Sequence, residues 1–284
     1  MGGRITACTL VAADGRSVPV LHPFPENHTD LDHWAKGGLY PLVPYSGRIR
    51  DARLRFADRD WPLAPYDGSP HTLHGIAQRR PWTLEAHSAT QARLRYAHSP
   101  DPHWPWAFEA TLDVALAPGR MTIGIALRNT GTQAMPGGIG LHPYFIHQPA
   151  DTVAFEAGKA WPFDADFLAR RPPMVACVAR PQQLDASAFM AGEVTRFHAG
   201  WSGTMDILSG ESGHERLRIE ASGALTQLVI HRPAQAPYLC IEPVSHVADG
   251  FNLQAQGVAG TGTQALAPGE SMQGSLAITL GSAA

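Results

Sequence analysis

Two side chains of this sequence have the chemistry to move protons as a pair, the imidazole of His142 and the carboxyl group of Glu242. His142 lies in Pro136-Gly-Gly-Ile-Gly-Leu-His-Pro-Tyr-Phe145, before a proline that biases its backbone away from the helical region. Glu242 follows the apolar run Tyr238-Leu-Cys-Ile241 and precedes a proline, so we expect it at the end of a buried strand. Because burial disfavours the ionised carboxylate, we expect the pKa of Glu242 to be raised. An imidazole and a tuned carboxylate are groups that general acid and base catalysis uses.

The neighbours of this imidazole in the sequence suggest a place for a small molecule. Gly137, Gly138 and Gly140 remove side-chain bulk, so we expect an open, glycine-lined floor beside the ring. Tyr144 and Phe145 follow at once, and Tyr144 is a candidate contact for a bound molecule. The structural alternatives are a glycine-rich turn with an ordinary half-buried histidine, and a glutamate that pairs with an arginine.

Two earlier stretches combine charged side chains with turn residues. In Pro44-Tyr-Ser-Gly-Arg-Ile-Arg50, a glycine permits a tight bend, and Arg48 can act as a multi-donor clamp on hydroxyl or phosphate oxygens. The alternative there is a solvated arginine at a strand start. The second stretch, His71-Thr-Leu-His-Gly-Ile-Ala-Gln-Arg-Arg-Pro-Trp82, has two histidines, two arginines and a tryptophan. An aromatic side chain beside hydrogen-bonding groups is a common arrangement around a sugar ring, although this tryptophan can equally belong to the core.

Other ways of doing chemistry find less support. The chain has 14 histidines, but no His-Glu-x-x-His motif is present, and we expect no metal ion. No Gly-x-Ser-x-Gly segment predicts a nucleophilic serine. No Gly-x-x-x-x-Gly-Lys-Ser/Thr loop predicts phosphate binding by backbone amides.

The charge balance disfavours polyanionic partners. Lys and Arg total 22 and Asp and Glu total 25, so the formal net charge is -3, and we expect neither nucleic acid nor an anionic membrane as a partner. We see no apolar core of a signal peptide at the N-terminus and no apolar run near the ~20 residues of a membrane span. Cys8, Cys177 and Cys240 are far apart and odd in number, which fits free thiols in a reducing compartment. We expect a soluble, cytoplasmic protein.

The elements that position these side chains are predicted to be strands. Apolar and polar residues alternate with a period of two, which is typical of strands with one face in a core. The alternating segments are 53–56, 93–96, 121–128 and 216–220. The more continuous apolar runs 225–230, 238–241 and 276–280 are predicted to be strands buried on both faces.

Turn residues separate these segments at short intervals. With 28 glycines and 24 prolines, the chain leaves room for short helices only. Helices are predicted at Asp30-Leu-Asp-His-Trp-Ala-Lys36 and Asp185-Ala-Ser-Ala-Phe-Met190, each with an aspartate that can cap it. No repeat or linker divides the chain, so we expect one mainly β domain over residues 1–284, a single large antiparallel sandwich with few short helices. The Pro-rich region 161–181 is expected to cross its surface.

Four motifs in order resemble the aldose 1-epimerase (galactose mutarotase-like) superfamily. They are Pro44-Tyr-Ser-Gly-Arg-Ile49, Leu73-His-Gly75 with Arg80-Pro-Trp82, Gly140-Leu-His-Pro-Tyr-Phe145, and Glu242-Pro-Val-Ser-His246 with Asn252. Each motif alone is weak. Together, in this order and spread over roughly residues 40–252, they form a specific pattern.

The resemblance implies a large antiparallel β-supersandwich with an open sugar-binding cleft. It also implies an enzyme that interconverts the anomers of an aldose without metal or cofactor. In such an enzyme Glu242 would be the general base that removes the proton of the C1 hydroxyl, and His142 the general acid that protonates the ring oxygen. The pyranose then opens, and closure on the other face gives the other anomer. Arg48 and His74 would bind or orient the sugar.

The sequence departs from the family pattern in one place. Relatives with a Gly-Trp-Asp-Gly element use its aspartate as a sugar contact, whereas this chain reads Gly200-Trp-Ser-Gly203. Trp201 and Ser202 are therefore candidate substrate contacts, but a neutral hydroxyl cannot replace a carboxylate as a strong acceptor for sugar hydroxyls. Asp206 is close enough in the sequence to take over that role.

Three functions fit these residues. The first is an aldose 1-epimerase-like mutarotase that acts on a small-molecule sugar. The second is a hexose-6-phosphate 1-epimerase, because Arg48, Arg79 and Arg80 suit a phosphate dianion. The third, motivated by Ser202, is a carbohydrate-binding protein that has lost turnover. In each case we expect a monomer or a homodimer.

Overall fold

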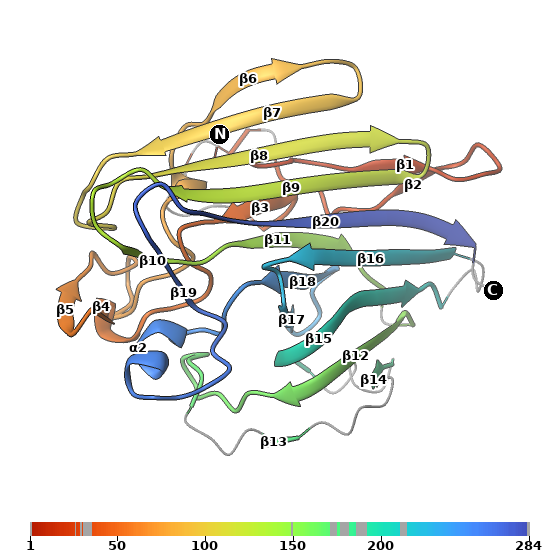
Figure 1. Cartoon of the computed structure of the whole chain (residues 1–284). Coiled ribbons are helices and arrows are strands. Elements are labelled where there is room, and N and C mark those ends of the chain that lie inside the picture. Colours follow the sequence, from red (N-terminus) through yellow and green to blue (C-terminus); the bar gives the residue numbers. More distant parts are fainter. Residues whose placement is uncertain are drawn as a thin grey trace.

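Figure 1 presents the computed structural model of the chain, which describes residues 2–25, 27–28, 30, 36–148, 150–170, 175–176, 182–185, 192–210 and 215–282. Strands make up most of the regular structure in these residues, so the prediction of a mainly β fold with few short helices is confirmed. The helices described are η1 (Arg50–Ala52), η2 (Ala77–Arg79) and α2 (Gly250–Ala255). Most of the two predicted helices, residues 31–35 and 186–190, lies outside the described residues.

One antiparallel sheet dominates the fold, and within the described residues it has 14 strands. From one edge to the other, its main path runs through β3 (Leu39–Leu42), β11 (Gly140–Ile146), β18 (Tyr238–Val244), β17 (Gln227–Arg232), β15 (Val194–Leu208), β16 (Glu215–Gly223), β20 (Ser271–Ser282), β9 (Arg120–Asn129), β8 (Phe108–Ala117), β7 (Gln91–His98) and β6 (Thr83–His87). Off this path, β12 (Thr152–Ala160) pairs with β15, β13 (Val175–Ala176) and β14 (Gln182–Leu184).

Three short strand pairs lie apart from the large sheet in the hydrogen-bonding pattern. They are β1 (Thr9–Val11) with β2 (Ser17–Pro19), β4 (Arg53–Phe56) with β5 (Arg59–Pro62), and β10 (Met135–Gly137) with β19 (Gln264–Leu266). Figure 1 shows the long strands β8, β9 and β20 side by side in one layer, with β18, β17 and β15 below them. The chain thus stacks two parts of one continuous sheet.

The alternating segments of the sequence form strands as predicted. The segments at 53–56, 93–96, 121–128 and 216–220 lie in β4, β7, β9 and β16. In β9 the apolar residues of the alternating set are buried, while most of the residues between them are only half-buried. The continuous run at 238–241 begins β18, whose residues are buried on both faces from Leu239 onward. The hydrophobic pattern is therefore a reliable guide to these strands, because each side chain keeps the face that the period of two assigns to it.

The same period divides the residues of β3, β11 and β18 between two environments. Leu141, Phe145 and Ile241 pack into the main hydrophobic core between the layers. The residues between them, such as Tyr144 and Cys240, lie on the opposite face in a smaller apolar cluster. That opposite face is where the ionisable side chains of these strands are found.

The long strand β15 bends between its two halves. Residues 194–199 pair with β17, and residues 204–208 pair with β16, so the sheet divides along this strand. Gly200 and Gly203 have φ values of 63° and 83°, a backbone region that L residues with side chains rarely adopt. A side chain at 203 would also place its Cβ 2.7 Å from the carbonyl oxygen of Ala221. The stretch predicted as a sugar contact is therefore the bend of this strand.

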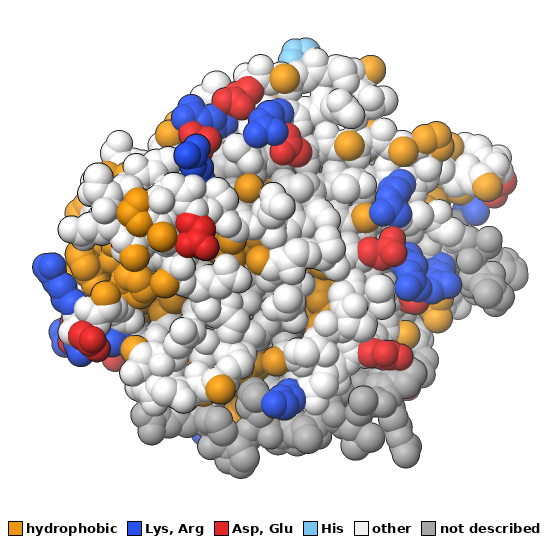
Figure 2. Space-filling view, viewed as in Figure 1, with side chains coloured by type: hydrophobic (Ala, Val, Ile, Leu, Met, Phe, Trp, Pro, Cys, Tyr) orange, Lys and Arg blue, Asp and Glu red, His pale blue; other side chains and the backbone are white. Residues whose placement is uncertain are grey.

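The surface carries charges of both signs. Figure 2 shows the basic and acidic side chains interspersed on the face in view. Across the described ranges, no helix is long and apolar enough to cross a membrane.

Candidate active site

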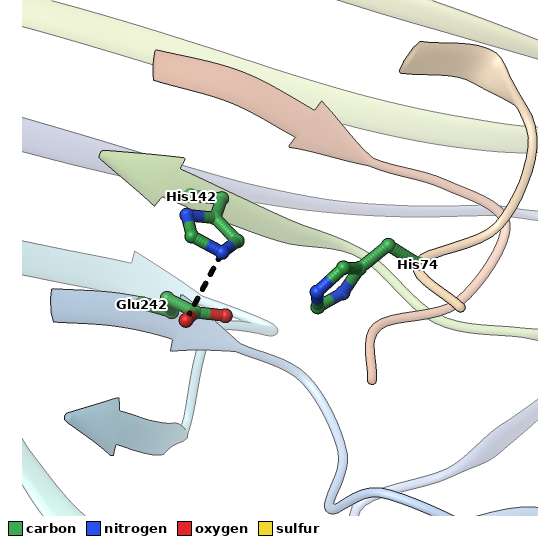
Figure 3. A group of neighbouring side chains, drawn as sticks. All are labelled: His74, His142 and Glu242. Carbon is green, nitrogen blue, oxygen red and sulfur yellow. Dashed lines mark ion pairs between the residues drawn. The ribbon is translucent and has the colours of Figure 1, made fainter. Parts of the chain in front are cut away.

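His142 and Glu242 are in direct contact. His142 Nε2 lies 3.2 Å from Glu242 Oε1, and the two residues are only 6% and 5% exposed (Figure 3). The contact follows from the antiparallel register of β11 and β18, in which Gly140 faces Val244 and Tyr144 faces Cys240. Residues 142 and 242 are therefore opposite one another and, by the pleat of the sheet, point to the same side. The imidazole and carboxyl group singled out in the sequence form one pair, with no arginine as the partner of Glu242 in the described residues.

Two aromatic rings hold the imidazole of His142. Tyr40 and Tyr144 stack on it from β3 and from β11 itself, with ring centroids at 4.6 and 4.7 Å and interplanar angles of 21°. Its Nδ1 atom is buried and has no hydrogen-bond partner in the part of the chain described. Stacking, and not a hydrogen bond at Nδ1, therefore sets the orientation of the ring.

Burial moves the pKa values of this pair in opposite directions. Desolvation raises the pKa of Glu242 to about 8, and the Lys36 ammonium opposes that rise. Desolvation lowers the pKa of His142 well below its usual value, and the positive charges that His74 and Lys36 can carry lower it further. Near pH 7 the pair thus carries one proton between its two facing atoms, and the direct contact lets that proton lie on either group.

His74 approaches the pair from a loop. Its ring meets that of His142 edge to face at a centroid distance of 5.3 Å (Figure 3). The backbone N–H of Gly47 donates a 3.1 Å hydrogen bond to His74 Nδ1. Burial lowers the pKa of His74 to about 3, so the ring is neutral and its proton must be on Nε2. His74 therefore offers a hydrogen-bond donor at Nε2.

The same hydrogen bond makes His74 a poor metal ligand. One ligand-type atom each of His74, His142 and Glu242 lies within 4.8 Å of the others, close enough to surround an ion. A metal at His74 Nε2 would need that nitrogen without its proton, while Nδ1 is already an acceptor. Metal-bound histidines usually donate from their second nitrogen to a carboxylate or carbonyl, and neither His74 nor His142 does so among the described residues. The donor set favours proton transfer over metal binding.

The pair lies in a cavity of about 220 Å³, here called the site cavity. Its lining includes the inner-face residues of β3, β11, β18, β17 and β15, together with Arg48 and His74 from loops. Arg48 donates from Nη1 to the backbone oxygen of Asp166 at 2.7 Å, and its guanidinium lies 5.5 Å from the ring centroid of Phe167. Tyr144 lines the cavity, whereas its neighbour Phe145 packs in the main core.

A larger groove of about 980 Å³ lies elsewhere on the surface, beside β4 and α2. Its charged side chains largely satisfy one another: Arg50 bonds Asp164 and approaches Asp249, and Arg55 bonds Asp60. We regard the smaller cavity as the candidate site, because it holds a buried acid and a buried base in direct contact, both with displaced pKa values. In the larger groove burial also raises the pKa of Asp249, but that carboxyl group faces Arg50 and, among the described residues, no base.

Several predicted contacts lie outside the site cavity. Trp201 packs in the main core and donates from Nε1 to the backbone oxygen of Thr204. Ser202 is exposed and bonds within its own turn, so the bend of β15 explains both residues. Asp206, the suggested replacement for the missing aspartate, is held by Arg216 and Arg218. These findings remove the reason for inferring a protein without turnover from Ser202.

The predicted arginine cluster does not form around the cavity. Arg79 lies behind the wall, with its guanidinium 4.5 Å from the ring centroid of Tyr66, and is not part of the lining. Arg80 lies 3.7 Å from the carboxylate of Asp101. Of the three arginines proposed for a phosphate, Arg48 alone lines the cavity within the described residues.

The prediction of an open, glycine-lined floor for a ligand was wrong. A Cβ on Gly138 would lie 2.2 Å from the ring of His246, and one on Gly140 would lie 2.9 Å from Val244. The room beside these glycines is therefore filled by protein side chains and is not open to a ligand.

Several lining residues lie outside the four motifs, among them Lys36, Phe167, His231 and Tyr40, the last of which stacks on His142. His231 ends the apolar run 225–230 just as Glu242 ends the run 238–241, so the same signal could have found it. Lys36 and Phe167 carry no comparable signal, because loops of unrelated sequence position bring them to the cavity.

A family model described as aldose 1-epimerase matches residues 1–279. The uncharacterized protein YphB of Escherichia coli K12 is 27% identical over 268 residues, covering 90% of this chain and 86% of YphB. A galactose mutarotase-like protein of Clostridium acetobutylicum has a TM-score of 0.79 at 16% identity, covering 99% of this chain and 94% of that one. A GalM/aldose epimerase homologue of C. elegans has a TM-score of 0.79 at 14% identity, covering 100% of this chain and 94% of that one. The fold is thus galactose mutarotase-like, as the four motifs predicted.

Proposed function

The chain belongs to the aldose 1-epimerase family, and we propose that it interconverts the α and β anomers of an aldose by acid- and base-catalysed ring opening. One observation carries the proposal, the 3.2 Å contact between His142 Nε2 and Glu242 Oε1 at the cavity. A hemiacetal presents two oxygens on one carbon, the C1 hydroxyl and the ring oxygen. An acid and a base that touch one another can reach both oxygens at once.

The reaction needs two proton transfers and one bond cleavage. The Glu242 carboxylate removes the proton of the C1 hydroxyl, and the electrons of that O–H bond form the aldehyde C=O. The bond between C1 and the ring oxygen breaks, and the ring oxygen takes a proton from the His142 imidazolium. Rotation about the C1–C2 bond and the reverse transfers close the ring with the opposite configuration. Both groups return to their starting protonation states, so no further reactant is consumed.

The proton count of the buried pair suits this sequence of steps. Before ring opening the proton is on His142, and afterwards it is on Glu242, so the pair carries one proton in both states. Burial favours the neutral form, with the proton on Glu242, which is the form reached when the aldehyde is bound. The Lys36 charge lowers the pKa of Glu242 and thereby supports the reactive ionised carboxylate.

The remaining lining residues would hold the sugar. His74 Nε2–H and the Arg48 guanidinium offer donors to sugar oxygens, and Tyr144 offers an aromatic wall. Arg79 would contribute indirectly, because its guanidinium packs on Tyr66, which lines the cavity. Trp201 and Ser202 are left out of the proposal, because neither lines the cavity.

The test is the rate of anomer exchange. Freshly dissolved single anomers of D-glucose, D-galactose and other aldoses are followed by polarimetry with and without the protein. We expect acceleration with at least one sugar and its loss in Glu242→Gln. No acceleration with any aldose of the panel would refute the proposal.

A hexose 6-phosphate is the second candidate substrate, on a narrower basis than the sequence suggested. Lys36 and Arg48 both line the cavity, and Glu242 is the one acidic side chain among its described lining residues. Two cations near the cavity can attract a phosphate dianion. Rates on glucose and glucose 6-phosphate separate the two substrates, and a preference for glucose would exclude the phosphorylated one.

The cellular location and the oligomeric state of the protein are also part of the proposal. Cys8 and Cys240 are both buried free thiols, which supports a reducing, cytoplasmic location. A monomer or homodimer is expected, and light scattering coupled to size-exclusion chromatography would distinguish the two.

A further inference from the structure

Three side chains beside the site cavity form a hydrogen-bonded chain that the proposed mechanism does not use. Thr195 on β15 and His231 on β17 face each other across the strand pair. The Thr195 hydroxyl lies 3.3 Å from Glu193 Oε1 and 3.0 Å from His231 Nδ1. Glu193 is exposed, Thr195 is buried and His231 is half-buried, and both Thr195 and His231 belong to the cavity lining. The chain therefore runs from solvent to the cavity.

The direction of the protons follows from the carboxylate end of this chain. A carboxylate only accepts hydrogen bonds, so the Thr195 hydroxyl donates its one proton to Glu193. The hydroxyl oxygen is then an acceptor toward His231, whose Nδ1 must donate. Burial lowers the pKa of His231, so its ring is neutral near pH 7 and its one ring proton is on Nδ1.

The other ring nitrogen of His231, Nε2, is consequently left with an open lone pair. No side chain or backbone group of the described residues bonds to it. Phe167 packs edge-on against the ring at a centroid distance of 5.9 Å, which shields one side of the imidazole. Lys36 is the cation whose charge acts on this ring, and Glu193 is the anion.

Two histidines of one cavity are thus fixed in opposite tautomers. His74 accepts at Nδ1 from the backbone N–H of Gly47 and so presents a donor at Nε2. His231 donates at Nδ1 to Thr195 and so presents an acceptor at Nε2. Neutral imidazoles can exchange tautomers in water, and these hydrogen bonds remove that freedom. The cavity therefore has a defined polarity for a ligand with hydroxyl groups.

We propose that His231 is a substrate-binding residue whose Nε2 accepts a hydrogen bond from a sugar hydroxyl, and that Thr195 and Glu193 are positioning residues that hold its tautomer. The inference rests on the proposed function only in taking a sugar as the ligand. It assigns His231 the acceptor role that the sequence led us to seek at residue 202, where no carboxylate is present. The substrate must then carry a hydroxyl that donates at this position.

The first experiment measures KM and kcat in four variants. His231→Leu removes the acceptor and is expected to raise KM roughly tenfold with little change in kcat, because one hydrogen bond to a bound group is lost. His231→Gln keeps an acceptor oxygen and is expected to recover much of that loss. Thr195→Val keeps the shape of the side chain but frees the tautomer, so we expect a smaller rise in KM. Thr111→Val, the same change on the distant strand β8, is the matched control.

A second experiment identifies the sugar hydroxyl. Monodeoxyfluoro derivatives of the best substrate replace one hydroxyl at a time by fluorine, which cannot donate a hydrogen bond. One derivative is expected to bind the wild type about tenfold more weakly but to bind His231→Leu no worse than the parent sugar does. Equal losses in both proteins at every position would overturn the assignment.

A third measurement does not depend on turnover. Long-range ¹⁵N–¹H correlation spectra of the imidazole groups report which nitrogen carries the proton. We expect an Nδ1–H signal for His231 in the free wild type and a shift toward Nε2–H in Thr195→Val. An Nε2–H ring in the wild type refutes the inference even if the enzyme is active. Absence of anomer exchange with the expected tautomer present refutes the proposed function instead.

Discussion

Two glycine-rich stretches, 136–145 and 200–203, look alike in the sequence and differ in the fold. The first carries His142 to the site cavity, where its imidazole meets Glu242 at 3.2 Å. The second forms the bend of β15, and its tryptophan and serine lie outside the cavity. Both match or nearly match a family motif, so motif likeness does not separate them. What separates the two stretches is the direct contact between a buried acid and a buried base, in which only the first stretch takes part.

Energetics explain why a buried acid and base in contact indicate a functional site more strongly than likeness to a motif does. Taking two ionisable groups out of water costs several kcal/mol, and apolar side chains of similar volume are often as stable in the same place. Packing therefore gives no reason for His142 and Glu242 to be where they are. The bend needs no chemistry to explain it, because the positive φ values and the close approach of Ala221 account for Gly200 and Gly203.

The largest effect on activity is expected from substitutions in the pair of His142 and Glu242. We expect Glu242→Gln and His142→Asn each to lower kcat by roughly 10³-fold, since each variant loses one proton transfer; Glu242→Gln also keeps the shape of the side chain, whereas His142→Asn gives up the stacked ring. Polarimetry on single anomers measures the rate, and circular dichroism checks that the variants fold. Variants that fold and keep kcat within about tenfold of the wild type would contradict the assigned roles.

The pH profile should reveal the single proton shared by the pair. Because the pKa of Glu242 is raised to about 8, the proton is retained up to that pH, and kcat/KM should fall above it, approaching tenfold per pH unit. Because the pKa of His142 is lowered, a second proton binds only well below pH 6.5, so the acid limb should lie there. Exchange rates from pH 4 to 10 measure both limbs. A profile that is flat through pH 8 to 10 would mean that this pair does not carry the reaction.

Substitutions in the bend of β15 are expected to change the stability of the fold and not the rate of the reaction. Gly203→Ala is expected to lower the unfolding free energy by about 2–3 kcal/mol, because its Cβ would meet Ala221 at 2.7 Å in addition to the strain of a positive φ. Gly200→Ala has its nearest atoms at 3.6 Å and should lose only about 1 kcal/mol through backbone strain. Urea unfolding measures both values, with kcat of the folded fraction as the control. A selective loss of kcat in either variant would return this stretch to the site.

The smallest effect is expected from the residue that most clearly departs from the family motif. Ser202→Ala removes a hydroxyl that bonds to Thr204 at the surface, so we expect a stability change within about 0.5 kcal/mol. We expect kcat/KM to stay within about twofold of the wild type, since a surface change away from the cavity disturbs neither partner of the pair. A tenfold rise in KM would show that Ser202 reaches the sugar after all.

Much of the fold and part of the site can be predicted from local sequence patterns. The period of two assigns the faces of β4, β7, β9 and β16, because local alternation sets which side chains share a face. The order of four motifs identifies the family and points to His142 and Glu242. A carboxylate at the end of an apolar run, with its pKa raised by burial, is also foreseeable from the residues around it.

Other features depended on which strands became neighbours, and local patterns carry no information about that. The pairing of β11 with β18 joins residues about 100 positions apart and turns two candidate residues into one acid–base pair. The pairing of β15 with β17 brings Thr195 to His231 and selects the tautomer of that ring. Because β15 pairs with β17 along its first half and with β16 along its second half, Gly200–Gly203 form a bend between the two halves. Local patterns in the sequence are thus enough to predict the strands and the types of chemical group available. Which of these groups touch depends on the folded chain, because strand register and sheet order arise from long-range burial and hydrogen bonding.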